Sequence, residues 1–487
     1  MAFYRCGGGG GTNLYSDAAK NTVGDVKTAA LKPSEYISSS PNWYRCNNIF
    51  RNNATFNDIV VVGENVAETR GMLYNAKNFS KPVIFMGNNL SDAATMFSSA
   101  VNFNCPITFR SEQDLSLGSC FFGCKNFNSY VTMICNKNLY CDSMFANCTN
   151  LTHFPLVFAL NPTQIRPANM FKNSAASNTW ANDVKRFLED QVIYNYWSMF
   201  ENTSLYFGGV DNYTINLKNG SGAYFRGMFA NTGGELWANN FHLNAAECVP
   251  FVNTGGNTFF FCYQMFDRCN NVQNVTITPP TGAVQYDYAS FGYMFNNCQY
   301  FNGKFDLNGS ISSANTRLNG LFSGCMRYNQ NINLLNFGTI TNASHMFAFC
   351  FYAFNQKIDM NGEQGFNDCS YMFYDCGELN SIVRFPVSTM NYAYACAKTN
   401  LVGSKIYIKG NAASDWANKN FVGLVAERRS TARLNIWCNN WDALTGTTPE
   451  TSITGTEITW AVSGNAKYNA QYNIYILKNY SNVTNAP

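Results

Sequence analysis

A six-residue segment recurs along the chain, and this recurrence restricts the possible folds more than any other feature. A Met-Phe pair with a Cys three residues after the Phe occurs in SMFANC (143–148), YMFNNC (293–298), HMFAFC (345–350) and YMFYDC (371–376). Degenerate copies recur at intervals of 20 to 37 residues, most of them of about 25. Such a period is typical of solenoids, in which each unit buries its apolar side against its neighbours. We take the Met, or the residue in its place, as the anchor of each copy, and the anchors are Ile49, Met72, Met96, Cys120, Met144, Met170, Met199, Met228, Met265, Met294, Leu321, Met346, Met372 and Tyr392.

Two patterns that keep step with the anchor indicate the secondary structure of one repeat. About eleven to thirteen residues after the anchor stands an apolar–x–apolar triplet, as at 107–109, 131–133 and 383–385. This alternation predicts a short strand with two side chains inward and one outward. The Met-Phe-x-x-Cys segment has apolar residues at i, i+1 and i+4, which predicts one helical turn. The fold class that follows is an α/β repeat solenoid of short parallel strands plus helical turns.

The position four residues after the anchor accounts for many of the eighteen cysteines. Other copies have Ala, Ser or Thr there, so the position requires a small side chain rather than a thiol. A metal ligand or a paired thiol would not tolerate these replacements, whereas a free Cys serves as a small buried hydrophobe. We therefore interpret these cysteines as buried and unpaired, and disulfides between adjacent coils are the alternative in an oxidising environment. The cysteines at this position are Cys124, Cys148, Cys269, Cys298, Cys325, Cys350, Cys376 and Cys396.

The stretch CMRYNQNINLLNFGTITNASHMFAFC (325–350) resembles the repeat of BspA-like leucine-rich-repeat surface proteins. Residues 328–330 match the Phe-Asn-Gln of that repeat, residues 341–344 match its Thr-Asn-x-Ser, and Phe337 stands where the family has Trp. The resemblance covers about residues 46–400. It implies a leucine-rich-repeat-like solenoid for adhesion and protein binding, without catalytic residues, of a kind found on bacterial surfaces and in phage-encoded proteins. This chain differs in its uneven repeat lengths, its two ends and the lack of a secretion signal, so we expect a phage-encoded member.

The chain divides into four predicted segments. Residues 1–45 form an N-terminal attachment segment with a Gly-rich tether at 7–11, and residues 46–400 form the solenoid, with a helical insertion at 178–197. Residues 401–445 form a strand–helix–strand cap, with strands at 405–409 and 434–438 and a helix from Ser414 to about Glu427. Residues 446–487 form a small β-rich C-terminal region, in which 457–462 and 472–477 pair as a hairpin.

No arrangement of residues predicts catalysis, a metal site or a cofactor. The three histidines, His153, His242 and His345, have no metal-ligand spacing with cysteines or carboxylates. We interpret His242 as an outward strand residue and His345 as a turn residue. No Gly-x-Ser-x-Gly elbow is present. The sequence therefore predicts a protein that is not an enzyme, and the alternative is a glycan-cleaving spike that assembles two carboxylates between coils.

The outward strand residues form the predicted partner-binding face. Because the middle residue of each triplet points away from the core, these residues line one surface if the strands are in register. A solvated sheet face without a partner is the alternative interpretation. Trp437, Trp441 and Trp460 make the terminal region a competing contact region, although these side chains could equally lie in the core. The residues of the predicted face are Thr108, Thr132, Thr276, Asp306, Asn333, Asp359 and Arg384.

Composition and charge narrow the range of partners. Charged residues make up 13% of the chain, about half of the share of about 25% that is typical of soluble domains. The net charge of +3 is spread without a basic stripe, which argues against nucleic acid. The chain has no apolar window long enough for a membrane span and no signal peptide.

Three hypotheses for function follow. The first is a virion appendage protein of the phage tail or fibre type. It would bind a host cell-surface protein or glycan through the solenoid and other virion proteins through its N-terminal segment, and it could be a homo-oligomer. The second is a bacterial cell-surface BspA-like adhesin, and the third is the glycan-cleaving enzyme. We favour the first, and hence location in a virion, because a Gly-rich joint precedes a repetitive body and no export signal is present.

Overall fold

The protein folds as a β-solenoid with parallel strands and very little helix. The computed structural model describes residues 4–6, 44–175, 178–205, 207, 211–232, 238–281, 285–360, 366–386, 389–408, 419–438, 453–454, 461–463 and 466–477. The chain forms two compact units. The first comprises Met1–Gly208, Ile215–Glu235 and Glu247–Val249, and the second comprises Gly209–Thr214, Leu236–Ala246 and Pro250–Pro487.

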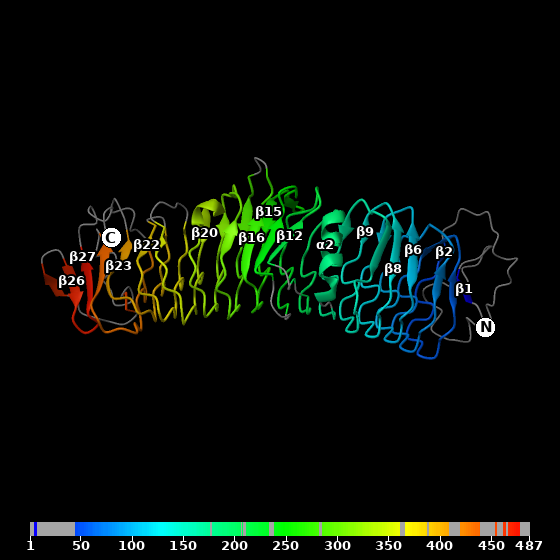
Figure 1. Ribbon diagram of the computed structural model, residues 1–487, viewed down its shortest axis with the longest axis horizontal. Helices are drawn as coiled ribbons and strands as arrows, with labels where there is room; N and C mark the ends of the chain where they lie inside the picture. Colours follow the sequence, from blue (N-terminus) through cyan, green and yellow to red (C-terminus); the bar gives the residue numbers. More distant parts are fainter. Residues whose placement is uncertain are drawn as a thin grey trace. The chain divides into compact units, whose positions relative to one another are not determined.

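In the first unit, most coils contribute two short strands, and each strand pairs in parallel with its counterpart in a neighbouring coil (Figure 1). One set of strands is β1 (Tyr4–Cys6), β3 (Val60–Val62), β5 (Val83–Phe85), β6 (Ile107–Ser111), β8 (Val131–Cys135) and β10 (Leu156–Leu160). The other set is β2 (Tyr44–Arg45), β4 (Val66–Glu68), β7 (Leu115–Ser116), β9 (Leu139–Tyr140) and β11 (Ile165–Arg166). The helical insertion predicted at 178–197 is confirmed for its first part, as η2 (Asn178–Trp180) and α2 (Ala181–Asp190). α2 buries Val184, Phe187 and Leu188, and no helix follows Asp190 up to residue 197.

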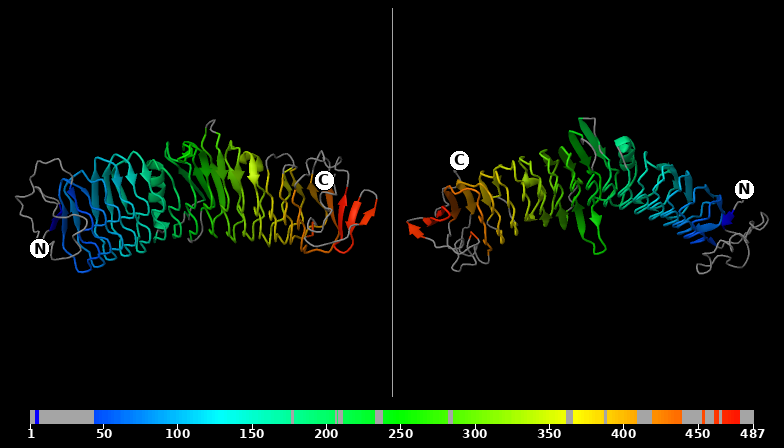
Figure 2. Two further views of the ribbon diagram at one scale, coloured as in Figure 1. Left: turned by 180° about the vertical axis from the view of Figure 1, so that it is seen from behind. Right: turned by 90° about the horizontal axis from the view of Figure 1, so that it is seen from below.

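The second unit is also built of short, mostly parallel strands, and Figure 2 shows its strands from behind and from below. One sheet contains β12 (Asn212–Asn216), β13 (Asn240–Asn244), β16 (Asn274–Thr278) and β18 (Phe305–Leu307). A second contains β14 (Phe251–Val252), β15 (Thr258–Phe261), β17 (Tyr288–Ser290), β19 (Thr316–Arg317) and β20 (Ile340–Asn342). A third contains β21 (Ile358–Asp359), β22 (Val383–Phe385), β23 (Gly403–Ile408), β24 (Leu434–Cys438), β27 (Ile474–Leu477), β26 (Ala466–Asn469) and β25 (Ala461–Ser463), in this order. The short helix η3 (Leu334–Phe337) precedes β20.

The anchor segment of each coil is a pair of tight turns, so the prediction of a helical turn is wrong. In the coil of Met96, the N–H groups of Thr95, Phe97 and Ser99 donate to carbonyl oxygens of the next coil at 2.7 to 2.8 Å, and the N–H groups between them donate within the coil. Thr95 and Ser99 have φ values of 55° and 64°. Positive φ recurs one residue before and three residues after the anchor in every described coil. An α-helix would require negative φ throughout and would keep all its N–H groups within one segment.

The positive φ values also correct the end of the repeat register. Tyr394 and Lys398 have φ values of 55° and 58°, which makes Ala395 the anchor in place of Tyr392. Cys396 therefore occupies the Phe position, and its predicted place at the small position is wrong. One more coil follows, with Gly423 (φ 64°) and Glu427 (φ 51°) on either side of its anchor Leu424. Residues 419–427 thus form no helix, while Ser414 lies outside the described residues.

The strands of the C-terminal region pair differently from the predicted hairpin. β26 lies between β25 and β27 and is antiparallel to both, so the two predicted partners are not neighbours. β27 instead continues the sheet in parallel with β24, with Ile476 opposite Ile436. The strands predicted for the cap at 405–409 and 434–438 correspond to β23 and β24.

Columns of aromatic rings fill the core between the strands and the turns. The Phe that follows the anchor stacks on its counterpart in the next coil, as in the Phe97–Phe121 (5.2 Å) and Phe347–Phe373 (5.5 Å) pairs. The aromatic residue seven positions after the anchor stacks on the same ring within its coil, for example Phe301 on Phe295 at 4.5 Å. Because stacked rings are worth more than their buried area alone, each coil fixes the position of the next.

The paired turns predict an unusual response to glycine. Ser119 has a φ of 54°, a conformation that is unfavourable by about 1–2 kcal/mol for residues with a Cβ. Ser116 in β7 is in an extended strand, where Gly is unfavourable by about 0.5–1 kcal/mol. We expect Ser119→Gly to be at least about 1 kcal/mol more stable than Ser116→Gly in chemical denaturation. Equal destabilisation by both substitutions would contradict the proposed strain in the turn.

Candidate binding surfaces

The repeated thiols belong to the structure of the solenoid rather than to a reactive site. The Sγ atoms of Cys124, Cys325 and Cys376 each donate to the carbonyl oxygen of a Phe in the preceding coil, at 2.9 Å in all three cases. Thr203 fills the same position but donates to the carbonyl oxygen of Phe200 in its own coil, at 2.8 Å. These three thiols therefore link two coils, whereas the threonine hydroxyl bonds within its own turn.

Burial makes these thiols unreactive. The cysteines Cys124, Cys148, Cys298, Cys325, Cys350 and Cys376 form no disulfide, and among the cysteines whose side chains are described only Cys105 is not buried. Desolvation raises the pKa of the Cys124, Cys298 and Cys350 thiols well above the ordinary value. Since the thiolate is the nucleophile and the metal ligand, this column is poorly suited to either role. Within the part of the chain that the structure describes, no three Cys, His, Asp or Glu side chains are grouped to hold a metal.

The structure places most of the predicted face on outward strand positions. Thr108 lies opposite Thr132 in β6 and β8, and Thr276 lies opposite Asp306 in β16 and β18. Asp359 is an exposed residue of β21. The first pair belongs to the first unit and the others to the second, so each pair forms only a local surface.

Two residues of the predicted face do not belong to it. Asn333 lies in no strand, because its side chain accepts a hydrogen bond from the N–H of Leu335 and caps η3. Arg384 is on β22, but it is 7% exposed. Its guanidinium donates to Asp359 Oδ2 at 2.5 Å and lies 5.5 Å from the ring of Tyr407. Arg384 is therefore a buried link between coils rather than a free contact residue.

The competing contact region is only partly described. Trp437 is half-buried on β24, and its ring is stacked on that of Tyr407 with centroids 6.4 Å apart. Trp441 and Trp460 lie outside the described residues. Two of the histidines contact neighbouring side chains. His242 Nε2 lies 2.7 Å from Thr278 Oγ1, and the ring of His345 stacks on that of Tyr371 with centroids 4.8 Å apart. Burial lowers the pKa of both histidines.

The outward face of the first set of strands in the first unit is apolar, which the sequence prediction missed. The side chains of Ile84, Met86, Val157 and Leu160 are 43–47% exposed. Val61 lies opposite Ile84 in β3 and β5. In the sheet of β6, β8 and β10, Thr108 lies opposite Thr132, Thr132 lies opposite Val157, and Ile134 lies opposite Leu160. We call the surface of Val61, Ile84, Met86, Ile134, Val157 and Leu160 the apolar sheet face. Its signal in the sequence was weak, because a triplet such as Val83-Ile84-Phe85 is apolar at the outward position too.

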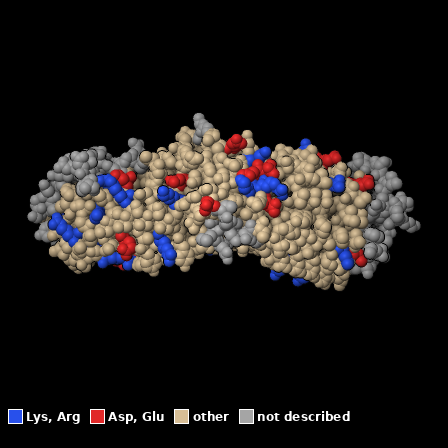
Figure 3. Space-filling view, viewed as in Figure 1, with Lys and Arg blue, Asp and Glu red and all other residues tan. Residues whose placement is uncertain are grey.

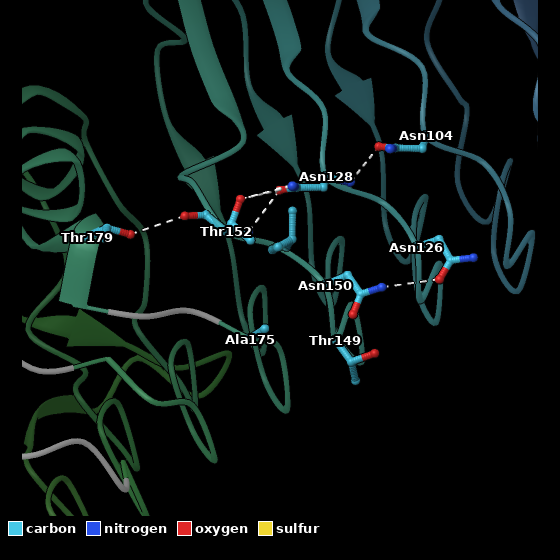
Figure 4. A pocket seen from close by; sticks show the side chains of 9 residues that line it. Asn104, Asn126, Asn128, Thr149, Asn150, Thr152, Ala175 and Thr179 are labelled. Carbon is cyan, nitrogen blue, oxygen red and sulfur yellow. Dashed lines mark hydrogen bonds between the residues drawn. The ribbon is translucent and has the colours of Figure 1, made fainter.

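A second surface of the first unit is a groove lined by amides and hydroxyls, with a volume of about 620 Å³. Figure 4 shows two rows of side chains that run from coil to coil. One row is Asn104, Asn128, Thr152 and Thr179, and the other contains Asn126, Asn150 and Thr149, with Leu151 and Ala175 completing the lining. We call this surface the amide groove. No sequence pattern singled out this groove, because the Phe-Asn pair was assigned only to the repeat.

The asparagine side chains of the groove are held by hydrogen bonds to residues of adjacent coils. Asn150 Nδ2 donates to Asn126 Oδ1 at 3.2 Å, and Asn126 Nδ2 donates to Asn102 Oδ1 at 2.9 Å. In the other row, the N–H of Asn128 donates to Asn104 Oδ1 at 2.7 Å, and the N–H of Thr152 donates to Asn128 Oδ1 at 2.8 Å. These ladders hold the amide planes at the period of the coils.

Charged side chains are sparse on the face shown in Figure 3, and a group of both signs lies around α2. Within α2, Lys185 forms an ion pair with Glu189, and Arg186 forms one with Asp183. Both join residues of the same helix and therefore stabilise it locally. In the described part of the chain, no helix has the length and apolar character needed to cross a membrane.

The burial of the thiols can be tested by labelling. In a Cys6→Ser variant, we expect roughly one thiol, Cys105, to react with a maleimide in the native protein, because it is the one remaining cysteine that is not fully buried. Unfolding in denaturant without a reductant should expose the other sixteen of the eighteen cysteines in the sequence. Mass spectrometry after proteolysis identifies the labelled positions. Blocked thiols in the unfolded chain would instead establish disulfides between coils.

Comparisons with known proteins bear on the repeat. No curated protein matches the chain. Among solved structures, the chain is similar to a leucine rich cell surface protein from Faecalibacterium prausnitzii, with 12% identity, 78% of this chain and 87% of that chain covered, and a TM-score of 0.34. Residues 44–156 and 261–390, just under half of the chain, match the model of the family described as "Mycoplasma protein of unknown function, DUF285". This is a family of BspA-like repeats, so the resemblance of the sequence to such repeats is confirmed, while its phage origin stays a prediction.

Proposed function

We propose that the protein is a non-enzymatic adhesion protein displayed at a cell surface, and that it binds a protein partner through the apolar sheet face. The observation that carries the proposal is the exposure of Ile84, Met86, Val157 and Leu160 on one side of a parallel arrangement of strands. Parallel sheets usually have both faces covered. Large apolar patches on soluble proteins commonly mark binding sites.

The chemistry of the face favours a protein as the partner. Arg110 is the one charged residue on the outward positions of β6, β8 and β10. An anionic membrane or a nucleic acid would require several cations in this area. Thr108 and Thr132 supply hydroxyls between the apolar side chains, and this mixture of apolar and neutral polar groups is typical of protein interfaces. The partner surface should therefore be apolar and weakly charged.

The strand geometry holds the face rigid before binding. Every apolar side chain on it belongs to, or directly follows, a strand that pairs with another coil. Next to Met86, a Cβ at Gly87 would lie 2.0 Å from the carbonyl oxygen of Glu64, so only glycine allows this close approach. A rigid surface loses little conformational freedom on binding. This suits a protein that attaches by a fixed surface.

The location at a cell surface is the second part of the proposal. The match to a BspA-like repeat family supports it, because such repeats resemble those of bacterial surface proteins. The location in a virion expected from the sequence has no corresponding support. The proposal requires no catalytic group, since the buried thiols serve the fold and the amide groove contains no carboxylate or histidine.

The double substitution Ile84→Lys/Val157→Lys tests the contact. The full chain is applied to a panel of immobilised animal extracellular-matrix proteins and bacterial envelope proteins in surface plasmon resonance. We expect binding to at least one of them, and a loss of at least tenfold in affinity, which corresponds to about 1.4 kcal/mol or more, in the variant. Both positions are exposed, so the melting temperature should stay close to that of the unsubstituted chain.

Leu335→Lys is the matched control, because Leu335 is 74% exposed but belongs to η3 of the second unit. It introduces the same side chain at an exposed apolar position and should leave binding unchanged. The proposal fails if no protein of the panel binds, or if the control weakens binding as much as the double variant does. Concentration-dependent self-association that the double variant abolishes would identify a second copy as the occupant and would also overturn it.

A further inference from the structure

We propose that the amide groove of the first unit binds an uncharged glycan chain. The nine side chains that line it include four Asn and three Thr, and none of them is charged. Amide and hydroxyl groups can each donate and accept hydrogen bonds. They therefore complement sugar hydroxyls, which also do both, without selecting a charge. An acidic polysaccharide would lack a cation among the lining residues to pair with.

The groove retains unused hydrogen-bonding capacity. Asn104 Nδ2, Thr149 Oγ1 and Asn150 Oδ1 make no hydrogen bond to any part of the chain that the structure describes, although the other amide atoms of Asn104 and Asn150 take part in the ladders. The orientation of Asn104 and Asn150 is therefore set by one side of each amide, while the other side meets solvent. Such preoriented groups lose little freedom when a ligand binds.

The spacing of the two rows suits a chain ligand rather than a single small molecule. Equivalent residues of adjacent coils, such as Asn126 and Asn150, repeat at about 4.8 Å, the separation of neighbouring parallel strands. The groove spans the coils from Asn104 to Thr179 and offers hydroxyls or amides in each. Leu151 lies beneath the rows but is only 1% exposed, so the contacts with a ligand fall to the amides and hydroxyls.

The second unit provides an internal comparison. It has the same type of ladder, in which the N–H of Asn329 donates to Asn302 Oδ1 at 2.8 Å and the N–H of Asn355 donates to Asn329 Oδ1 at 2.9 Å. The position six residues after the anchor, which is Asn in the groove, is Tyr300, Arg327 and Tyr352 in the corresponding consecutive coils. The ladder from backbone N–H groups to asparagine Oδ1 atoms therefore belongs to the fold in both units. The second row of amides, which contains Asn126 and Asn150, distinguishes the groove from these coils of the second unit.

Affinity electrophoresis of the full chain tests the inference, with gels that contain a neutral glucan, mannan, galactan or xylan, and with polygalacturonate and hyaluronan as acidic probes. We expect at least one neutral polysaccharide to retard the chain. Asn126→Ala/Asn150→Ala removes the second row of amides without a change in charge, and it should weaken the retardation at least tenfold. Thr149→Val keeps the shape of an exposed side chain that makes no hydrogen bond in the described structure, so it should weaken binding without any effect on folding.

Asn329→Ala is the matched control, because it breaks a ladder of the same type in the second unit. It should leave retardation unchanged. The inference is overturned if no neutral polysaccharide retards the chain, if only acidic ones do, or if the control loses binding as the groove variants do. The test is separate from that of the apolar sheet face, because the Ile84→Lys/Val157→Lys chain retains the groove and should still be retarded.

Discussion

The hydrogen bonds that the anchor turns donate to the next coil are the constraint on which the rest of the structure depends. Alternate N–H groups of each turn point out of the coil, and this direction requires positive φ on either side of the anchor. Residues as large as Tyr371 and His345 accept this conformation, although it is unfavourable by about 1–2 kcal/mol for each. Hydrogen bonds at both turns and buried rings offset the strain. The Phe columns, the Asn ladders and the thiols all repeat at the spacing that these bonds impose.

The sequence was sufficient to predict the period, the parallel strands and the buried cysteines. These features follow from side chains that repeat in the core, where packing tolerates few substitutions. The conformation of the anchor turn could not be predicted in the same way. An apolar pattern at i, i+1 and i+4 fits a helix as well as two tight turns. The residues with positive φ differ widely in type, from a glycine at Gly320 to a phenylalanine at Phe349. The turn is distinguished by the hydrogen bonds that its alternate backbone N–H groups donate to the next coil, and a pattern of side chains does not record them.

The candidate surfaces were harder to predict, because an outward position is defined by its environment and not by its residue type. Arg384 follows the strand pattern, yet the ring of Tyr407 and the carboxylate of Asp359 enclose it. Asn333 also fits the pattern, but its side chain prefers the N–H of Leu335, and this bond begins a short helix instead of a strand. Ile84 was overlooked for the opposite reason, since an apolar residue among apolar neighbours looks like core.

Core positions and exposed positions of the repeat differ in how freely their residues can change. A substitution in a Phe column disturbs two neighbouring coils, whereas the residue six positions after the anchor is exposed in coils such as those of Asn126 and Tyr300. Asn126 and Tyr300 occupy this same position in the two units, with an amide ladder around one and the guanidinium of Arg327 5.0 Å from the ring of the other. The solenoid therefore allows the chemistry of a surface to change coil by coil while the backbone bonds stay the same. Because ligand contacts then repeat at the coil spacing, extended partners such as a polysaccharide or a protein face fit this architecture better than a compact ligand does.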